Sequence, residues 1–459
     1  MNKKTLSQYI GYGVGALGMD LSYGLFYTFL SKYLTDVLYI PALFLMVVTF
    51  LARIWDGVND PMMGSIVDNT VSRFGKYRRW ILVGSACNAV ALALLFWNPG
   101  FTVAKGQPAS PGLLVWVAVM YVLWGMTNTM MDIPYWSMVP SLTSDPKQRN
   151  LAATVPRAFS GLGQMLIVLL SVRMIESLGG QAGLNAPGFR RWALLCGGAM
   201  VLLMLVSFTA TGRIHALTRT EAPKERFSLR TVLHTLRQND QLLVFMLVAL
   251  LHNTGWYLVS GLSTYYFENV WGDLHMVSLF GTLVGAGQAA GLLLLPLLTR
   301  WLERNTVIRL AMALSAAGYL GMFLFSAVWN ILPLFAAFGF LGMMGVGCGF
   351  VAQTVMLSDI VDYGEYKLGY RADSVVFSMK GFLQKGAYSI QSLVMYAGLA
   401  VTHYNGTLKT QPLSAQHGIT VMMFLFPPLL TLAALALFTK KYKLNRAAME
   451  DVAAQLGKA

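Results

Sequence analysis

Charged side chains are scarce in this sequence. Only 12% of its 459 residues are Asp, Glu, Lys or Arg, whereas soluble globular proteins carry about 25%. Hydrophobic residues make up 56% of the chain. This composition excludes an ordinary soluble enzyme and indicates that membrane lipid surrounds most of the chain.

Cysteine is rare as well. Cys87, Cys196 and Cys348 stand singly in apolar segments without CxxC spacing, so neither a disulfide framework nor a zinc site is predicted. A small-residue cleavage site after a short apolar stretch is also lacking near the N-terminus. We therefore expect no removable signal peptide.

Acidic residues are outnumbered by basic ones, with 20 Asp and Glu against 34 Lys and Arg and a net charge of +14. The basic side chains stand mainly in short connections between apolar segments, where they set membrane topology. This distribution predicts no binding to nucleic acid.

The apolar runs approach the roughly 20 residues that cross the hydrocarbon core of a bilayer. We predict an all-α membrane protein with twelve transmembrane helices, at residues 8–34, 40–66, 80–98, 112–137, 155–176, 191–212, 241–266, 276–298, 307–327, 332–357, 374–402 and 418–439. The even count places both termini on one side of the membrane. Because most Lys and Arg of the connections fall on that side, both termini are predicted to be cytoplasmic.

The longest polar connection separates six spans from six. The predicted domains are therefore an N-terminal six-helix bundle (1–212), a central cytoplasmic loop (213–240), a C-terminal six-helix bundle (241–439) and a cytoplasmic tail (440–459). Two halves of this kind are typical of transporters that rock about a site at the membrane midplane. At the inner surface we expect a hairpin from Gly64 through Ser72–Trp80 and a loop at Asp359–Arg371, and we hypothesise that they pair in the outward-facing state.

Two acids in the second span form the first candidate site. Asp56 and Asp60 are four residues apart, on one face of a helix. Both cannot stay charged in lipid, so one holds a proton or a cation lies between them. Asn59 and Thr129 add oxygen atoms of the kind that suit Na⁺ or Li⁺. The alternative is a plain salt bridge to Arg53 or to basic residues elsewhere.

A second group of polar residues suits a sugar. A sugar presents hydroxyl groups at its edge and C–H groups on its face, so carboxylate, guanidinium and aromatic side chains bind it together. Asp20, Asp132, Trp136 and Arg157 would form such a set if the first, fourth and fifth spans converge. The alternative is that Trp136 marks the membrane interface and Arg157 the inner surface.

Intramembrane basic residues complete the candidates. Lys385, with Lys380 before it, lies in the eleventh span. Lys385 facing the two aspartates would couple ion binding to rearrangement, whereas the alternative is that it snorkels to the surface. His252 in the seventh span is either a proton carrier or an ordinary bundle residue.

Four strings carry a family resemblance: RIWDGVNDPMMG, SRFGKYRRW, MDIPYWSMVP and LSDIVDYGEYKLG. They resemble the glycoside-pentoside-hexuronide:cation symporters of the major facilitator superfamily, and among these most of all the melibiose carriers. The resemblance extends from the first span to the eleventh. It implies the fold of that superfamily, in a bacterial inner membrane, with two six-helix halves.

The resemblance also implies roles for single residues. The residues matching Asp56, Asp60, Asn59 and Thr129 bind the coupling cation in that family, and the lysine matching Lys385 lies nearby. Those matching Asp20, Asp132, Trp136 and Arg157 contact the sugar.

The chain departs from the melibiose carriers at sugar-side positions, where Met19, Asn128 and Lys380 replace other residues, so specificity for melibiose itself is not predicted. The glucuronide transporters share the DYGE segment but carry Arg where this chain has Gln384. Lys380 is the residue that would meet an acidic sugar.

The prediction is a secondary active symporter, working as a monomer, that imports a galactoside-like glycoside with Na⁺, H⁺ or Li⁺ and needs no cofactor. The alternative substrate is a hexuronide or pentoside. Rival functions are lipid or drug transport, which would need an apolar cavity, and sugar sensing without transport. A membrane enzyme would need a nucleophile with a base or a metal constellation, and none is found at helical spacing.

Overall fold

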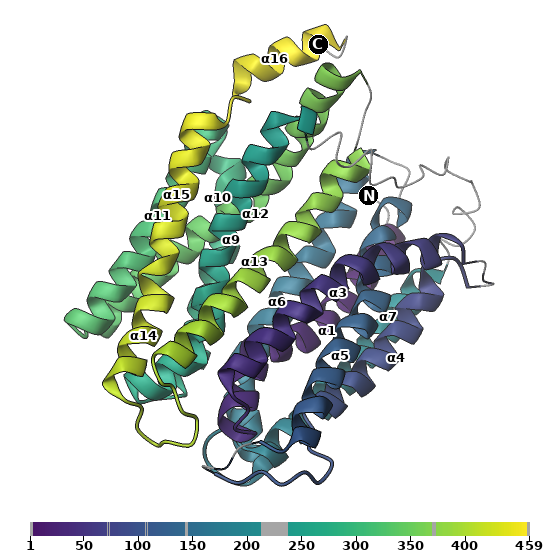
Figure 1. Cartoon of the computed structure of the whole chain (residues 1–459). Coiled ribbons are helices and arrows are strands. Elements are labelled where there is room, and N and C mark those ends of the chain that lie inside the picture. Colours follow the sequence, from purple (N-terminus) through teal and green to yellow (C-terminus); the bar gives the residue numbers. More distant parts are fainter. Residues whose placement is uncertain are drawn as a thin grey trace. The chain divides into compact units, whose positions relative to one another are not determined.

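The computed structural model describes residues 3–70, 72, 74–105, 107, 109–142, 146–212, 237–369 and 373–456 (Figure 1). Within these ranges the regular elements are all helical. Their contacts divide the chain into two compact units. Unit 1 comprises Met1–Pro223, Phe267–Thr282 and Leu399–Ala415, and unit 2 comprises Lys224–Tyr266, Leu283–Gly398 and Gln416–Ala459.

Unit 1 is built mainly from the first half of the sequence. Its helices are α1 (Lys3–Gly24), η1 (Leu25–Phe29), α2 (Leu30–Lys32), η2 (Tyr33–Val37), α3 (Ala42–Asp68), α4 (Arg78–Leu95), α5 (Pro111–Ser137), η3 (Val139–Leu142), α6 (Pro146–Gly179), α7 (Ala186–Ala210) and η5 (Phe267–Trp271). Helix α1 packs on α6 and α7, while α5 packs on α3 and α4.

Unit 2 holds most of the later helices. They are α9 (Asp240–Tyr266), α10 (Met276–Leu298), α11 (Arg304–Phe323), η6 (Leu324–Val328), α12 (Leu332–Leu368), α13 (Asp373–Val401), α14 (Leu413–Phe424), α15 (Phe426–Lys441) and α16 (Arg446–Gln455). Helices α11 and α12 meet backbone to backbone, because a Cβ on Gly318 would lie 2.2 Å from the Cα of Gly342. Small residues allow this close approach in membrane proteins.

Ten of the described helices are long and apolar enough to cross a membrane. The predicted spans 8–34 and 374–402 fall on α1 and α13, which are helical but are not among the ten. Both helices are only moderately apolar: α1 is rich in glycine, serine and tyrosine and carries Asp20, and α13 carries Lys380 and Lys385. The all-helical membrane architecture is confirmed, and the count of twelve stays a prediction.

Two segments predicted as turns or loops are helical. Gly64–Asp68 belongs to α3, and the turn comes later, at Gly75, whose φ is +92°. Most of the predicted loop Asp359–Arg371 belongs to α12, which ends at Gly369 in the left-handed region. A glycine within a helix lowers its stability but does not end it, and this explains the first error. The second segment was predicted as a loop from its mixed acids and bases, which a helix can also carry.

The acids and bases of that segment pair within unit 2. Asp359 bonds Arg304, and Lys367 lies 2.6 Å from Asp240. The hypothesis that the hairpin and this segment pair across the inner ends stays untested. Most of the central loop, residues 213–236, and Arg371 lie outside the described residues.

Candidate functional site

The two carboxylates of α3 face α5. The Thr129 hydroxyl donates a hydrogen bond to Asp60 Oδ1 at 3.0 Å. One helical turn away, a Cβ on Gly125 would lie 3.5 Å from Asp56 Oδ1. Gly125 and Thr129 are four residues apart, as are the two acids, so both pairs stack along one contact between two helices. The predicted cation residues are thereby brought together, and Gly125 makes room for Asp56.

Arg53 also belongs to this cluster. Its Nη1 lies 2.7 Å from Asp56 Oδ2, one turn along the same helix. The side chains of Arg53 and Asp56 are 12% and 10% exposed, so little water screens the pair. This is the ion pair that the alternative interpretation of the sequence expected for one acid. If the three side chains are charged, two carboxylates and one guanidinium leave a net charge of −1.

Asn59 completes the polar cluster on α3. The residue is 4% exposed, and its Nδ2 atom has no hydrogen-bond partner within the described part of the chain. Turning the amide by 180° exchanges Nδ2 and Oδ1, because the two ends have the same shape. An oxygen in this position would satisfy the buried amide by binding a cation. Carboxylate, amide and hydroxyl oxygens together form a hard donor set that suits Na⁺, Li⁺ or a proton.

The residues predicted to bind the sugar lie on α1, α5 and α6, the helices that correspond to the first, fourth and fifth predicted spans. The Ser160 hydroxyl of α6 donates to Asp20 Oδ2 of α1 at 2.5 Å. Arg157 lies one turn before Ser160, and its guanidinium stacks over the Trp136 ring of α5. The Arg157 Cζ atom lies 3.9 Å from the ring centroid. Stacking on Arg157 covers one face of Trp136 and orients the indole plane.

A tyrosine pair joins α1 to α5 beside these residues. Tyr12 and Tyr135 stack with their centroids 4.4 Å apart, and each hydroxyl donates to the backbone carbonyl of the other residue. Both side chains are fully buried. Further along, Asn128 Nδ2 donates to the Tyr23 hydroxyl at 3.1 Å. These contacts fix the register of the two helices that carry Asp20, Asp132 and Trp136.

Three site helices contain an internal proline. Each proline removes one backbone donor and leaves the carbonyl one turn earlier without its helical partner. Such positions bend a helix and offer free carbonyl oxygens. All three lie beside site residues: Pro61 follows Asp60, Pro134 lies between Asp132 and Trp136, and Pro156 precedes Arg157.

The basic candidates belong to unit 2. Lys385 is half-buried in α13, and its contact with the acids of unit 1 remains a prediction. Lys380 lies on the same helix, but its side chain is outside the described residues. His252 is buried, and neither ring nitrogen has a hydrogen-bond partner in the described ranges. A proton carrier needs such partners, so this geometry does not favour that role.

Sequence reasoning missed three contributors to the site. Gly125 carries no functional group, and only its packing against Asp56 reveals it. Ser160 and Tyr23 stand one turn or less from predicted sugar residues, and that spacing was a usable signal. Their partners, however, lie on other helices, which a single sequence does not place.

Residues 11–446 match the family described as MFS/sugar transport protein, where MFS denotes the major facilitator superfamily. The inner membrane symporter YicJ of Escherichia coli is 28% identical over 95% of this chain and 92% of its own length. The raffinose carrier protein of Pediococcus pentosaceus is 26% identical over 99% of this chain and 72% of its own length.

The fold is also that of solved transporters. The xylose transporter XylE from E. coli superposes with a TM-score of 0.61 at 12% identity, over 95% of this chain and 98% of that chain. Together with the family match, this gives the fold class and the general function. The chain belongs to the MFS/sugar transport protein family, as a sugar symporter of the glycoside-pentoside-hexuronide:cation type, and it is a multi-pass membrane transporter and not an enzyme.

Proposed function

We propose that this protein imports a galactoside-like glycoside together with one monovalent cation, Na⁺, H⁺ or Li⁺, across a bacterial inner membrane. The observation that carries the proposal is the position of α5. This helix bears Thr129, which donates a hydrogen bond to Asp60. Within two turns of Thr129 it also bears Asn128, Asp132 and Trp136, which are predicted to bind the sugar. One rigid element therefore reaches both ligand groups.

The cation half of the proposal rests on charge. Arg53, Asp56 and Asp60 together carry a net charge of −1 when all three are ionised, and none of the three side chains is fully exposed. A monovalent cation beside Asp60, Asn59 and Thr129 neutralises that charge and removes the repulsion between the two acids. Cation binding thus stabilises the packing of α3 against α5.

The sugar half rests on the shape of the aromatic and polar groups. Arg157 stacks on one face of Trp136, and the C–H face of a sugar ring is proposed to pack against the opposite face of the indole. Asp20, oriented by Ser160, and Asp132 supply acceptors for sugar hydroxyls. A galactoside is favoured because one relative is a raffinose carrier, and raffinose contains a galactosyl group.

Coupling follows from the shared helix. Each ligand favours the arrangement of α5 that the other needs, so cation and sugar raise each other's affinity by the same factor. With both sites filled, the halves rock to release the solute on the cytoplasmic side, where both termini are proposed to lie. Lys385 is proposed to take the place of the cation when its site is empty.

The test is solute uptake into proteoliposomes at fixed membrane potential, with a Na⁺, Li⁺ or pH gradient. The panel contains raffinose, lactose, a xylose disaccharide and a glucuronide, which separates galactoside from pentoside and hexuronide transport. Asp60→Asn is expected to reduce cation-driven uptake at least about tenfold, because one charge-assisted interaction is worth roughly 1.5–3 kcal/mol.

The matched control is Glu450→Gln, which neutralises an exposed acid paired with Arg446 on α16. This variant is expected to transport like the unmodified protein. Cation-driven uptake that is the same in Asp60→Asn as in the control would refute the assigned cation site. Uptake of none of the sugars under any gradient would refute the proposed function.

A further inference from the structure

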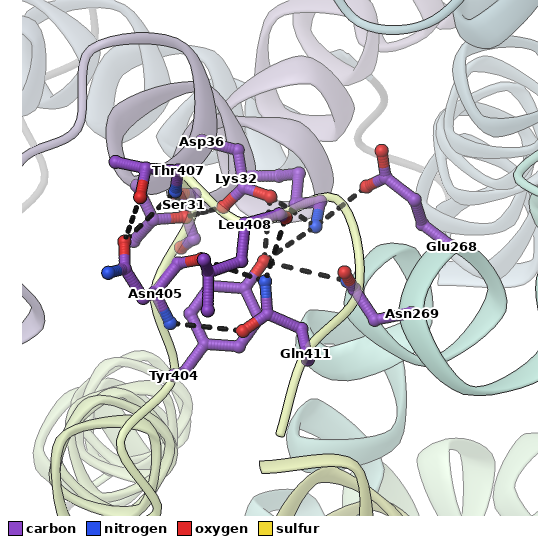
Figure 2. Close-up of polar contacts among 11 residues, drawn as sticks. Ser31, Lys32, Asp36, Glu268, Asn269, Tyr404, Asn405, Thr407, Leu408 and Gln411 are labelled. Carbon is purple, nitrogen blue, oxygen red and sulfur yellow. Dashed lines mark hydrogen bonds and ion pairs between the residues drawn. The ribbon is translucent and has the colours of Figure 1, made fainter. Parts of the chain in front are cut away.

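A lysine in unit 1 is completely buried and surrounded by three acceptors (Figure 2). The Lys32 side chain is 0% exposed, and its Nζ lies 2.6 Å from Asp36 Oδ2, 2.6 Å from Glu268 Oε2 and 2.8 Å from the Tyr404 hydroxyl oxygen. Lys32 donates a hydrogen bond to the Tyr404 hydroxyl and forms ion pairs with the two carboxylates. This burial of an ammonium requires these partners, because an unpaired charge there would be strongly unfavourable.

Tyr404 lies at the centre of the cluster. Its hydroxyl donates to Asp36 Oδ2 at 2.6 Å and accepts from Lys32 and from Asn269 Nδ2, the latter at 3.5 Å. Burial, reinforced by the neighbouring Asp36 carboxylate, holds the pKa of Tyr404 well above its ordinary value. The hydroxyl therefore keeps its proton and remains a donor to Asp36.

The members of the cluster come from separate parts of the sequence. Lys32 and Asp36 follow α1, whereas Glu268 and Asn269 follow α9 and Tyr404 follows α13. The segments Phe267–Thr282 and Leu399–Ala415 continue helices of unit 2, yet their contacts group them with unit 1. Figure 2 shows their side chains converging on Lys32. The cluster thus ties the connections of the later helices to the end of the first helix.

The Leu399–Ala415 connection is held rigidly against that end. Gln411 donates to the Asn405 carbonyl at 2.8 Å and accepts from its backbone N–H at 3.0 Å, which closes the loop on itself. The loop also approaches the backbone before α3 very closely, since a Cβ on Gly406 would lie 2.3 Å from the Thr35 carbonyl oxygen. Opening this contact therefore moves the whole loop and not a single side chain.

We propose that Lys32 holds the outer side of the protein closed, through contacts with Glu268 and Tyr404 that break when the outer side opens. We call this cluster of Lys32, Asp36, Glu268 and Tyr404 the latch, and the outer opening that it closes the outer gate. The inference rests on the proposed function, because an alternating-access carrier must open this end to admit its solute. The connections after the first, seventh and eleventh predicted spans all lie opposite the termini, on the outer side in the proposed topology. Glu268 and Tyr404 belong to two of these connections, and Lys32 stands at the outer end of the first predicted span.

Asp36 has a different part in the latch from Glu268. Lys32 and Asp36 are four residues apart along one continuous helical segment, so their ion pair survives separation of the loops. Lys32 is therefore still paired with a carboxylate when the gate is open. Glu268 and Tyr404 act only in the closed state, and their loss shifts the equilibrium towards opening.

The test uses the full chain in lipid nanodiscs with spin labels at Gln181 and Lys409, both exposed and both in outer connections. Cys87, Cys196 and Cys348, which are free thiols, are first replaced by alanine. Double electron–electron resonance spectroscopy then measures the distance distribution between the two labels. Glu268→Gln and Tyr404→Phe are each expected to raise the ratio of the longer to the shorter distance roughly tenfold.

Glu450→Gln, the exposed acid on α16, is the matched control and is expected to keep the original distribution. Tyr404→Phe changes no charge, so it tests the latch even if Glu268→Gln folds poorly. Unchanged distributions in a folded variant of either residue would overturn the proposal. The distances require no solute, so longer distances without uptake of any sugar would retain the latch and refute only the proposed function.

Discussion

Replacing Arg53 separates the two interpretations of the carboxylates on α3. If Arg53 competes with the coupling cation for Asp56, Arg53→Gln removes the competitor and strengthens cation binding. Two unit charges 4 Å apart interact by about 4 kcal/mol at an effective dielectric constant of 20. The Arg53–Asp56 contact is shorter, but a cation beside Asp60 would lie farther from Arg53 than Asp56 does.

We therefore expect a gain of about 1–3 kcal/mol, or roughly 5- to 150-fold in the cation dissociation constant. Isothermal titration calorimetry of the purified protein with NaCl, at a constant ionic strength set by choline chloride, measures the dissociation constant of Na⁺. Arg53→Lys keeps the charge and is the matched control, with an affinity close to the original. Equal or weaker Na⁺ affinity in Arg53→Gln, with an unchanged melting temperature, would refute competition and make the Arg53–Asp56 pair purely structural.

Two further predictions concern sugar affinity and packing. Ser160→Ala removes the hydroxyl that orients Asp20. Because a hydrogen bond to a charged group contributes about 1.5–3 kcal/mol, sugar affinity should fall roughly 10- to 150-fold. The Na⁺ affinity measured without sugar should stay the same, and titration calorimetry measures both affinities. Gly318→Ala places a Cβ 2.2 Å from the Gly342 Cα. The melting temperature should therefore fall, because overpacking of this kind costs about 1–3 kcal/mol of stability. An unchanged melting temperature would show that α11 and α12 separate easily.

The sequence alone predicted the helices well because the bilayer imposes a fixed length on each apolar run. The bounds of α10, for example, are those expected for residues 276–298. It failed at Gly64, where a glycine was interpreted as part of a turn, and at Asp359–Arg371, where a charged segment was interpreted as a loop. A helix continues through such a residue when nothing else competes for its backbone hydrogen bonds, and α12 ends only at Gly369.

Spacing along the chain predicted contacts only within a helix, whereas the grouping of residues from different helices rested on their chemistry and on the family resemblance. The spacing of Asp56 and Asp60 fixes their common face, and the structure brings both towards α5. In the latch around Lys32, spacing relates only Lys32 to Asp36, because Glu268 and Tyr404 are more than 230 positions away from Lys32 along the chain. Lys32 itself stands near a span end, where a lysine ordinarily snorkels to water. Its burial depends on acceptors that only the fold brings together.

In the proposed mechanism, helix α5 couples the cation site to the sugar site without contact between the two ligands. Asn128 and Thr129 are consecutive, so their side chains leave the helix about 100° apart. One bonds Tyr23 of α1 and the other bonds Asp60 of α3. A cation that orders Asp60 and Thr129 therefore also fixes the rotation of α5, and with it the direction in which Asn128 and the sugar residues beyond it point. The sugar then binds to groups whose orientation has already been restricted, which lowers the entropy lost on binding. Coupling of this kind needs no chain of hydrogen bonds between the sites, only a helix too stiff to turn one residue without its neighbour.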